Sequence, residues 1–495
     1  MTQDTHPAPA ALRLLINGTW QEGTSAALIS ANPAHPEQTV AEGRQATEDD
    51  VDRAFAAAAA AGGQWARTPV QQRGAILLRA AELLEAGAAQ FGKELSREEG
   101  KTAAEGVGEV RRAAQILRYQ AAEGEHQAGE VFHSPRPAEK ILVTRKPLGA
   151  VGVITPFNFP IAIPAWKIAP ALVHGNTVVW KPASTVPLLA MRLAEALHKA
   201  GLPDGVLNLV YGSGPLGSAI TQHTKLAGLT FTGSTGVGRQ LAAAAAGRGV
   251  PMQAEMGGKN AALVLADADL ETAADQVLLG AFRSTGQKCT ATSRLIVDGS
   301  VADDLIARLK ARLEFWVVGD PTDPEVHMGP LIHAEAAAEV RRGVQAAIDQ
   351  GAHLIYRGAA PESSGGQDAF LPATILELPR DADAAEANSA WWDEFFGPVL
   401  TMRRVSGAQE AFDLANQGEF GLTSAIFTED VGHILEAMEE LDVGILHVNS
   451  ESAGADPHVP FGGAKGSGYG PKEQGQAAKD FFTHTTTVYL RSGSS

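Results

Sequence analysis

The hydrophobic pattern changes near residue 140, where short apolar runs begin to alternate with stretches whose apolar residues recur at helical spacing. The runs predict strands at 141–144, 150–154, 177–180, 206–211 and 226–231, with helices between them at 163–173, 187–200 and 215–223. A second series has a strand at 261–265, a helix at 270–282 and a strand at 293–297, and it continues to about residue 446. Because strand, helix and strand at this spacing form βαβ crossovers, the pattern predicts two α/β units with parallel sheets.

The N-terminal part carries turn and cap signals. Asn17-Gly18 tolerates the positive φ angles of a tight hairpin turn, so residues 14–20 are predicted to form two short strands. Residues 47–50 resemble a capping box before an alanine-rich helix, and Thr68-Pro69 opens a second helix. A helical layer is therefore expected before the first α/β unit.

Two predicted strands, 141–144 and 481–490, have no obvious neighbour in the sequence. The second is rich in threonine and alternates between polar and apolar residues. Strands with open edges often pair with each other or with another subunit, so both pairings are considered.

Composition limits the classes of partner. The 495-residue chain has room for two or three domains, and 44% hydrophobic and 20% charged residues are typical of a globular protein. We expect no membrane span, because no apolar run is long enough, and no nucleic-acid partner, because the net charge is −17. The N-terminal residues lack the basic and apolar stretches of a secretory signal, so a cytoplasmic protein is expected. Neither disulfides nor a metal site are expected, since there is one cysteine and the histidines show no ligand spacing.

That cysteine, Cys289, is the first candidate for chemistry. Free cysteines usually pack as small hydrophobic residues, and this inert alternative stays open. Cys289 instead follows a Gly-Gln-Lys turn, and a carboxylate and an amide suited to catalysis, Glu255 and Asn158, occur upstream. The context indicates a candidate nucleophile.

Two glycine-containing stretches are candidate phosphate sites. Residues 231–238 end a strand and begin a helix, so backbone N–H groups and the helix dipole can receive a diphosphate. Their G-x-x-G-x-G spacing is not the usual dinucleotide pattern, and such glycines more often mark only a tight turn. Gly100-Lys101-Thr102 looks like the end of a phosphate loop, but Leu95 stands where glycine is required, so we predict a surface turn there.

Several motifs occur together in one order. They are Phe157-Asn158-Phe159-Pro160, Lys181-Pro182, Phe231-Thr232-Gly233-Ser234, Glu255-Met256-Gly257-Gly258-Lys259, Gly286-Gln287-Lys288-Cys289, Glu394-Phe395-Phe396-Gly397-Pro398 and Pro460-Phe461-Gly462-Gly463. With this set the chain resembles the aldehyde dehydrogenase superfamily from about Leu14 to Leu490. The resemblance implies an α/β fold with a Rossmann-type cofactor domain, an α/β catalytic domain and a small β oligomerisation arm.

The resemblance implies NAD(P)-dependent oxidation of an aldehyde to the free acid. Cys289 matches the family nucleophile, which forms a thiohemiacetal and then a thioester that water cleaves. Asn158 matches the amide that stabilises the oxyanion, Glu255 the general base, and Lys167 a lysine near the active-site floor. By residue type alone, Asn158 fits a turn residue and Glu255 a solvated carboxylate.

Two alternatives to this activity are kept. A coenzyme A-acylating semialdehyde dehydrogenase is disfavoured, because such relatives generally lack a glutamate at the position of Glu255. A non-catalytic structural or binding protein on the same fold is disfavoured because the implied nucleophile, base and amide are all present.

The resemblance also implies a nicotinamide cofactor site. Lys181 matches the lysine that holds the adenine ribose, Glu394 the residue that binds the nicotinamide ribose and Phe396 the aromatic beside it, although the last two also fit ordinary loop and core residues. Ser184 stands where many NAD-preferring members have glutamate, and since a carboxylate there would repel a 2′-phosphate, NADP as well as NAD is expected. The other implied cofactor contacts are Thr155, Pro156, Phe157, Ala183, Gly214, Phe231, Thr232, Gly233, Ser234 and Val237.

A carboxylate-bearing semialdehyde is the expected small-molecule substrate. Arg283 falls where succinate semialdehyde dehydrogenases have an arginine that binds the substrate carboxylate, although a surface arginine is nearly as common. Phe159 is the second implied substrate contact. The C-terminal part is similar to the 2-oxoglutarate semialdehyde (2,5-dioxovalerate) branch, in the motifs His458-Val459-Pro460-Phe461-Gly462-Gly463, Gly470-Pro471-Lys472-Glu473-Gln474-Gly475 and Thr487-Val488-Tyr489.

The resemblance finally implies a division of the chain. Residues 1–125 and 149–256 are expected to form the NAD(P)-binding domain, 257–455 the catalytic domain that carries Cys289, and 126–148 with 476–495 the oligomerisation arm. The C-terminal strand is expected to complete the arm's sheet across a subunit boundary, in a homodimer or homotetramer.

Overall fold

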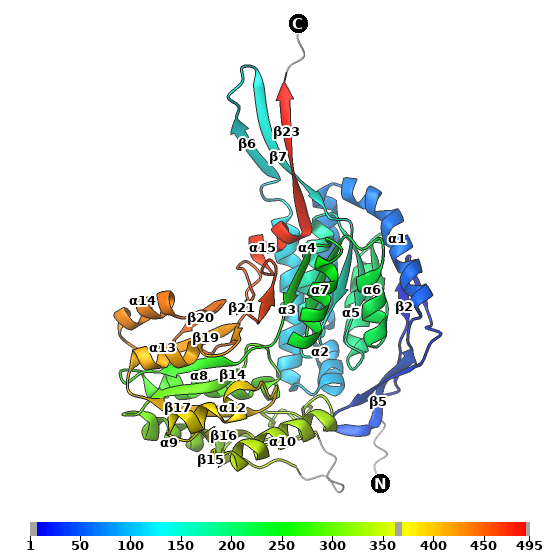
Figure 1. Cartoon of the computed structure of the whole chain (residues 1–495). Helices are drawn as coiled ribbons and strands as arrows, with labels where there is room; N and C mark the ends of the chain where they lie inside the picture. The colour runs from blue at the N-terminus through cyan, green and yellow to red at the C-terminus, as the bar shows by residue number, and fades with distance from the viewer. Residues whose placement is uncertain (1–6, 362–368, 492–495) are drawn as a thin grey trace.

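Two separate sheets, each with parallel strands at its centre, form the framework of the protein (Figure 1). The computed structural model describes residues 7–361 and 369–491. The first sheet has the order β22-β12-β11-β8-β9-β10-β2-β3. Its central parallel strands are β8 (Ala150–Ile154), β9 (Thr177–Lys181), β10 (Leu207–Leu209), β11 (Gly228–Thr232) and β12 (Met252–Glu255). The antiparallel edge strands are β2 (Leu14–Ile16), β3 (Thr19–Gln21) and β22 (Gly468–Tyr469). All residues of the central strands are buried, which explains their short apolar runs.

Helices precede and connect these strands. They are α1 (Glu48–Arg67), α2 (Val70–Glu99), α3 (Ala103–Glu123), α4 (Ala162–Val173), α5 (Pro187–Lys199), α6 (Gly214–Gln222) and α7 (Thr235–Ala246). Helix α3 packs against both α2 and α4, so its first turn lies close to the loop that follows β8. The predicted strand and helix order of this unit is confirmed.

Two local predictions in the N-terminal part are confirmed in detail. Asn17 and Gly18 have φ angles of 50° and 73°, as a tight turn between β2 and β3 requires. The Thr47 side chain accepts from the Asp50 N–H while the Asp50 carboxylate accepts from the Thr47 N–H, which is a complete capping box for α1.

The second sheet has the order β15-β16-β17-β14-β13-β19-β20. Its strands are β13 (Asn260–Val264), β14 (Thr292–Asp298), β15 (His353–Arg357), β16 (Thr374–Glu377), β17 (Val399–Val405), β19 (Thr423–Phe427) and β20 (Ile445–Val448). Its helices are α8 (Leu270–Phe282), α9 (Ala302–Leu313), α10 (Ala334–Asp349), α11 (Ala382–Glu386), α12 (Ser389–Trp392), α13 (Ala408–Asn416) and α14 (Val431–Glu440). Along β13, Ala261 and Leu263 pack into one core and Ala262 and Val264 into another, because successive side chains point to opposite faces. The second predicted α/β unit is confirmed.

A three-stranded sheet projects from the body of the molecule (Figure 1). It joins β6 (Gly129–His133), β7 (Glu139–Pro147) and β23 (Thr483–Arg491), which follows α15 (Gly475–Phe482). Strand β23 pairs antiparallel with β7 from Thr483 opposite Pro147 to Arg491 opposite Glu139. The pairing of the two predicted orphan strands is confirmed, but its expected position across a subunit boundary is wrong, because β23 completes the sheet of its own chain. Residues 492–495 of the predicted arm, residues 1–6 of the predicted cofactor domain and 362–368 of the predicted catalytic domain lie outside the described residues.

Smaller sheets complete the fold. One joins β1 (Ala10–Ala11), β5 (His35–Arg44) and β4 (Ala27–Asn32), and another joins β18 (Phe420–Gly421) to β21 (Ala464–Lys465). Among the described helices, none is long and apolar enough to cross a membrane.

The predicted surface turn at Gly100-Lys101-Thr102 is wrong. Lys101 is 2% exposed and Thr102 is 8% exposed, because the turn lies between α2 and α3 and faces the interior. Inside the protein, the Lys101 ammonium is 2.8 Å from a carboxylate oxygen of Glu109, which compensates its charge.

Candidate active site

The first sheet brings several predicted site residues to one edge. In its parallel register Ile154 lies opposite Lys181, and Thr232 opposite Glu255, so the carboxyl ends of β8, β9, β11 and β12 meet there. Asn158 follows β8 directly. This is the edge at which open α/β sheets bind ligands.

The second sheet contributes the loop that carries Cys289. Between α8 and β14 the chain passes through η1 (Arg283–Gly286), in which Ser284 and Thr285 have φ angles of 54° and 56°. Such angles are unfavourable for a β-branched residue, so surrounding contacts must hold the loop. The Glu105 carboxylate accepts from the Ser284 N–H at 2.8 Å, and the Asn260 amide donates to the Cys289 carbonyl at 2.7 Å.

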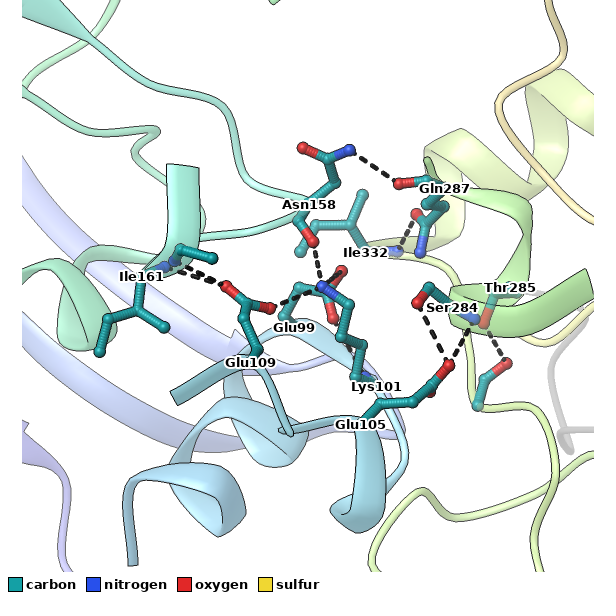
Figure 2. A network of polar contacts seen from close by, with 12 residues as sticks. Glu99, Lys101, Glu105, Glu109, Asn158, Ile161, Ser284, Thr285, Gln287 and Ile332 are labelled. Atoms are coloured by element: carbon teal, nitrogen blue, oxygen red, sulfur yellow. Dashed lines mark hydrogen bonds and ion pairs between the residues drawn. The ribbon is translucent and has the colours of Figure 1, made fainter. Parts of the chain in front are cut away.

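Cys289 is half-buried and faces a cavity of about 570 Å³. Phe159, Trp166 and Arg283 line the same cavity. The Asn158 side chain is 2% exposed and donates from Nδ2 to the Gln287 carbonyl at 2.9 Å, as Figure 2 shows. The loop after β8 and the Cys289 loop are therefore joined by a direct hydrogen bond.

The surroundings of Cys289 favour a protonated thiol. Burial, together with the nearby Glu255 and Glu394 carboxylates, raises the pKa of Cys289 to about 12. Glu255 is itself buried, and burial and the neighbouring Glu473 raise its pKa well above the ordinary carboxyl value. A base must therefore remove the thiol proton before the sulfur can act as a nucleophile near neutral pH.

Lys167 is completely buried in the neighbourhood of Glu255. Its ammonium forms an ion pair with Glu473 and donates to Thr230 Oγ1 at 2.9 Å. Trp166 Nε1 donates to the other Glu473 oxygen at 2.7 Å. The sequence predicted that Lys167 lies near the floor of the site but gave no role to Glu473. Glu473 belongs to one of the C-terminal motifs that resemble the 2-oxoglutarate semialdehyde branch.

The predicted adenine end of the cofactor site contains polar groups that have room for a ligand. Burial lowers the pKa of Lys181 to about 8, and its ammonium donates only a long hydrogen bond, to the Pro182 carbonyl at 3.5 Å. Within the described chain, the buried Thr232 hydroxyl has no hydrogen-bond partner, and the Ser234 side chain does not cap α7. Ser184 donates to the Gly212 carbonyl at 2.9 Å. These features fit a dinucleotide whose phosphates approach the start of α7.

The other predicted cofactor residues lie around the same edge. Thr155 follows β8 and accepts from Trp180 Nε1 at 3.0 Å, Gly214 is exposed at the start of α6, and Val237 is exposed on α7. Pro156, Phe157, Ala183 and Gly233 are half-buried in the turns after the strands, Ser234 is exposed in the last of these turns, and Phe231 is buried at the end of β11.

Glu394 and Phe396 approach this edge from the second unit. Glu394 accepts from the Gly258 N–H at 3.2 Å, and burial raises the pKa of its carboxyl to about 7. Phe396 has a φ angle of 48°, and its ring meets the Phe157 ring edge-on at 5.8 Å between centroids. A separate hollow of about 680 Å³ also touches Glu394 but shares no lining residue with the Cys289 cavity. The chemistry belongs to the smaller cavity, because only its lining contains the thiol.

Arg283 shares the cavity of Cys289 but is not a free cation. Its guanidinium is 3.4 Å from a Glu451 oxygen and 3.8 Å from a Glu105 oxygen, and its side chain is 46% exposed. Arg112, which sequence reasoning missed, also lines the cavity and pairs with Asp456 at 3.1 Å. A substrate carboxylate would have to compete with these acidic partners.

Comparisons with known proteins agree with this architecture. The aldehyde dehydrogenase family model matches residues 20–488. An alpha-ketoglutaric semialdehyde dehydrogenase of Bacillus subtilis (strain 168) is 40% identical over 480 residues, covering 96% of this chain and 97% of the relative. A 2,5-dioxopentanoate dehydrogenase of Saccharolobus solfataricus is 38% identical over 474 residues, covering 95% of this chain and 97% of the relative. The crystal structure of an NAD-dependent aldehyde dehydrogenase from Sinorhizobium meliloti superimposes with a TM-score of 0.92 at 32% identity, covering 97% of this chain and 95% of that one. The resemblance seen in the motifs is therefore confirmed, and the chain belongs to the aldehyde dehydrogenase family of NAD(P)-dependent oxidoreductases.

Proposed function

We propose that this enzyme oxidises a carboxylate-bearing semialdehyde, such as 2-oxoglutarate semialdehyde, to the free dicarboxylic acid. The observation that carries the proposal is the Cys289 cavity, which the thiol and the side chains of Arg283 and Arg112 line together. The Asn158 turn is bonded to the Cys289 loop through the Gln287 carbonyl. The names of the two relatives above support this substrate class. Arg283 and Arg112 would bind the distal carboxylate, while Phe159 would contact the chain between the two functional groups.

The proposed chemistry uses three side chains from two sheets. The Cys289 sulfur adds to the aldehyde carbon as its proton passes to the Glu255 carboxylate, whose raised pKa gives it a high proton affinity. The Asn158 amide stabilises the resulting oxyanion, a donor role worth about 3 kcal/mol. Bound NAD(P) supplies the hydride acceptor, and the chain then holds the acyl group as a Cys289 thioester. Glu255 first releases the thiol proton to solvent and becomes a carboxylate again. It then takes a proton from water as the water oxygen adds to the thioester carbon, and it returns that proton to the departing Cys289 sulfur, which restores the thiol and leaves the free acid.

Lys167 supports this site through its ion pair with Glu473. This ion pair holds the Glu473 carboxylate beside Glu255, and this neighbouring carboxylate raises the proton affinity of Glu255.

The cofactor would lie along the carboxyl edge of the first sheet. Lys181 and Ser184 would hold the adenine ribose, Thr232 and the start of α7 the phosphates, and Glu394 with Phe396 the nicotinamide end. The unpartnered Thr232 hydroxyl and the uncapped α7 in the described chain support this placement.

We assign the domains as the sequence divides them, with the cofactor domain at 1–125 and 149–256, the catalytic domain at 257–455, and the arm at 126–148 and 476–495. The sheet orders support this division, since β8–β12 and β13–β20 belong to different sheets. The exposed apolar side chains of the arm support a homodimer or homotetramer. A cytoplasmic location fits, because the thiol must stay reduced.

A substrate panel tests the proposed reaction. Short aldehydes with and without a distal carboxylate are assayed with each cofactor, in the presence and absence of coenzyme A. We expect the highest kcat/KM for a semialdehyde and no requirement for coenzyme A. A strict requirement for coenzyme A would make the enzyme an acylating dehydrogenase.

The Glu255→Gln variant tests the hydrolytic step. Because the amide can take a proton from neither the thiol nor water, both thiol addition and deacylation should slow. Deacylation should slow by about 10²- to 10⁴-fold, so that the acyl-enzyme that does form should accumulate. Intact mass spectrometry measures the adduct, and Cys289→Ala is the matched control that cannot form one. An E255Q enzyme that turns over normally would remove Glu255 from this role.

The Ser184→Glu variant tests cofactor selection. A carboxylate beside the adenine ribose would repel a 2′-phosphate, so the ratio of kcat/KM for NADP to that for NAD should fall by about tenfold or more. Ser184→Ala controls for loss of the hydrogen bond to Gly212. An unchanged ratio in S184E would contradict the ribose assignment.

A further inference from the structure

The start of helix α3 carries charged side chains that contact both catalytic loops. Lys101, Glu105 and Glu109 follow one another at four-residue intervals, and Figure 2 shows them between the two loops. The Lys101 and Glu109 side chains are each 2% exposed, and that of Glu105 is 11% exposed. The first turns of α3 therefore present charged groups to the inside of the protein.

Lys101 and Glu109 fix both sides of the turn that carries Asn158. The Lys101 ammonium donates to the Asn158 backbone carbonyl, and it lies 3.7 Å from the centre of the Phe159 ring. Glu109 Oε2 is 2.8 Å from that ammonium, while Glu109 Oε1 accepts from the N–H groups of Ile161 and Ala162 at 3.1 and 3.2 Å. One carboxylate thus binds the start of α4 and also orients the lysine on the preceding turn.

Glu105 fixes the loop that carries Cys289 in a similar way. Its Oε1 accepts from the N–H of Ser284 at 2.8 Å and from the Ser284 hydroxyl at 3.2 Å, and Ser284 is one of the two residues with positive φ in this loop. Its Oε2 accepts from the Thr102 N–H at 3.1 Å and completes the capping box of α3. Both catalytic loops therefore take their position from the same helix turn.

A buried ion pair is a poor source of stability. Removing two charges from water costs free energy, and apolar side chains of similar volume are often at least as stabilising. The contacts of Lys101 and Glu109 instead converge on one short turn, which is the turn that holds the proposed oxyanion donor. Such a pair supplies precise positioning of the backbone groups that it contacts.

We propose that Lys101 and Glu109 are positioning residues that hold the Asn158 amide at the oxyanion site. The proposal rests on the proposed function, because it requires Asn158 to stabilise the oxyanion. It goes beyond that function by assigning a role to two side chains that line the Cys289 cavity and act through the Asn158 turn.

A double-mutant cycle tests the proposal. Lys101→Met with Glu109→Gln keeps the side-chain volumes and the acceptor for Ile161 and Ala162. It also removes the cation 3.9 Å from Glu99, but burial already raises the pKa of that carboxyl to about 8, so Glu99 takes up a proton in the variant near neutral pH. We expect kcat to fall by roughly a hundredfold, as for a misplaced catalytic group, with KM for the aldehyde and Kd for the cofactor changed by less than about threefold. In an Asn158→Ala background the same pair of changes should reduce kcat by less than about threefold, because the positioned group is already absent.

Controls separate this role from simple destabilisation. Arg192→Met with Glu94→Gln removes another largely buried ion pair, with 2.7 Å between its atoms and side chains 18% and 17% exposed. It should lower the melting temperature without changing kcat. If the Lys101 and Glu109 double variant does not fold, Glu109→Gln alone replaces it, with an expected loss of about tenfold that again disappears in the Asn158→Ala background.

The outcomes are distinguishable. An equal loss of kcat with and without Asn158 would overturn the positioning role while leaving the oxyanion role intact. Full activity of Asn158→Ala alone would instead overturn the oxyanion role in the proposed function. A fall in kcat for the Arg192 control equal to that of the test variant would also overturn the proposal, since any buried pair would then act alike.

Discussion

At the scale of single residues, the chemistry depends on one sulfur in surroundings that keep it protonated. Reactive cysteines are usually activated by nearby positive charge, which lowers the thiol pKa. Around Cys289 the opposite holds, because burial and the carboxylates of Glu255 and Glu394 raise its pKa to about 12. The ammonium of the neighbouring Lys288 instead donates to the Leu279 carbonyl and lies 3.8 Å from a Glu451 carboxylate oxygen. The thiolate must therefore form only as the proton is taken.

The pH dependence of alkylation tests this environment. With a pKa near 12, the thiolate fraction of Cys289 increases about tenfold per pH unit throughout the range from pH 6 to pH 9. Iodoacetamide should therefore alkylate the cofactor-free enzyme at a rate that rises with the same slope and shows no plateau. Glutathione alkylated in parallel is the control, since an ordinary thiol begins to level off near pH 9. A plateau below pH 8 for Cys289 would contradict a raised pKa.

At the scale of elements, the same capping motif has different roles in two helices. Helices α1 and α3 both begin with a threonine capping box, at Thr47 and at Thr102. The first stabilises an outer helix of the cofactor unit, whereas the second begins the helix that contacts both catalytic loops.

The two caps provide a matched pair of variants. Thr47→Ala and Thr102→Ala should each cost about 1 kcal/mol, because each leaves helix N–H groups without their side-chain acceptor. Thermal unfolding should show similar small decreases in melting temperature for both. Only Thr102→Ala should also lower kcat, by about tenfold, because it loosens the turn next to Lys101. Equal kcat values would show that the start of α3 does not position the loops.

At the scale of the whole molecule, the arm exposes a surface that the rest of the chain does not cover. Val131 is 71% exposed, Phe132 48% and Tyr489 58%, and all three lie on strands of the projecting sheet (Figure 1). Phe132 and Tyr489 are both in register with Ile141 and share one face of the sheet, whereas Val131 lies on the other face. Exposed apolar side chains gathered on one element commonly mark interfaces. Strand β23 lies at one edge of this sheet and β20 at one edge of the second sheet.

Charged substitutions on the arm test its role in assembly. Val131→Glu with Phe132→Glu should shift the enzyme toward the monomer, because two buried charges would oppose the interface. Multi-angle light scattering after size-exclusion chromatography measures the mass. Phe315→Glu is the control, since Phe315 is 77% exposed and lies on the catalytic unit away from the arm. An unchanged mass for the arm variant would show that assembly uses another surface.

Local signals in the sequence were sufficient for the elements and for part of the site. Strands such as β8 and helices such as α8 match the predicted ranges, because apolar spacing reports directly on which face of an element is buried. The roles of Cys289, Glu255 and Asn158 stay predictions, but their motifs lie at loops that the structure brings together.

Tertiary packing alone decided the remaining features. Lys101 looked like part of a surface turn because its sequence neighbours are polar, yet α2, α3 and the Asn158 loop enclose it and Glu109 compensates its charge. Glu473 acquires its place beside Lys167 only when the C-terminal segment folds back on the first sheet. Strand β23 could have paired with either chain by its sequence, and the path of α15 brings it to β7 of its own chain. Periodicity in the sequence determines which residues of an element are buried, whereas the partners of a buried charge or an open strand edge depend on distant segments that only the complete fold brings into contact.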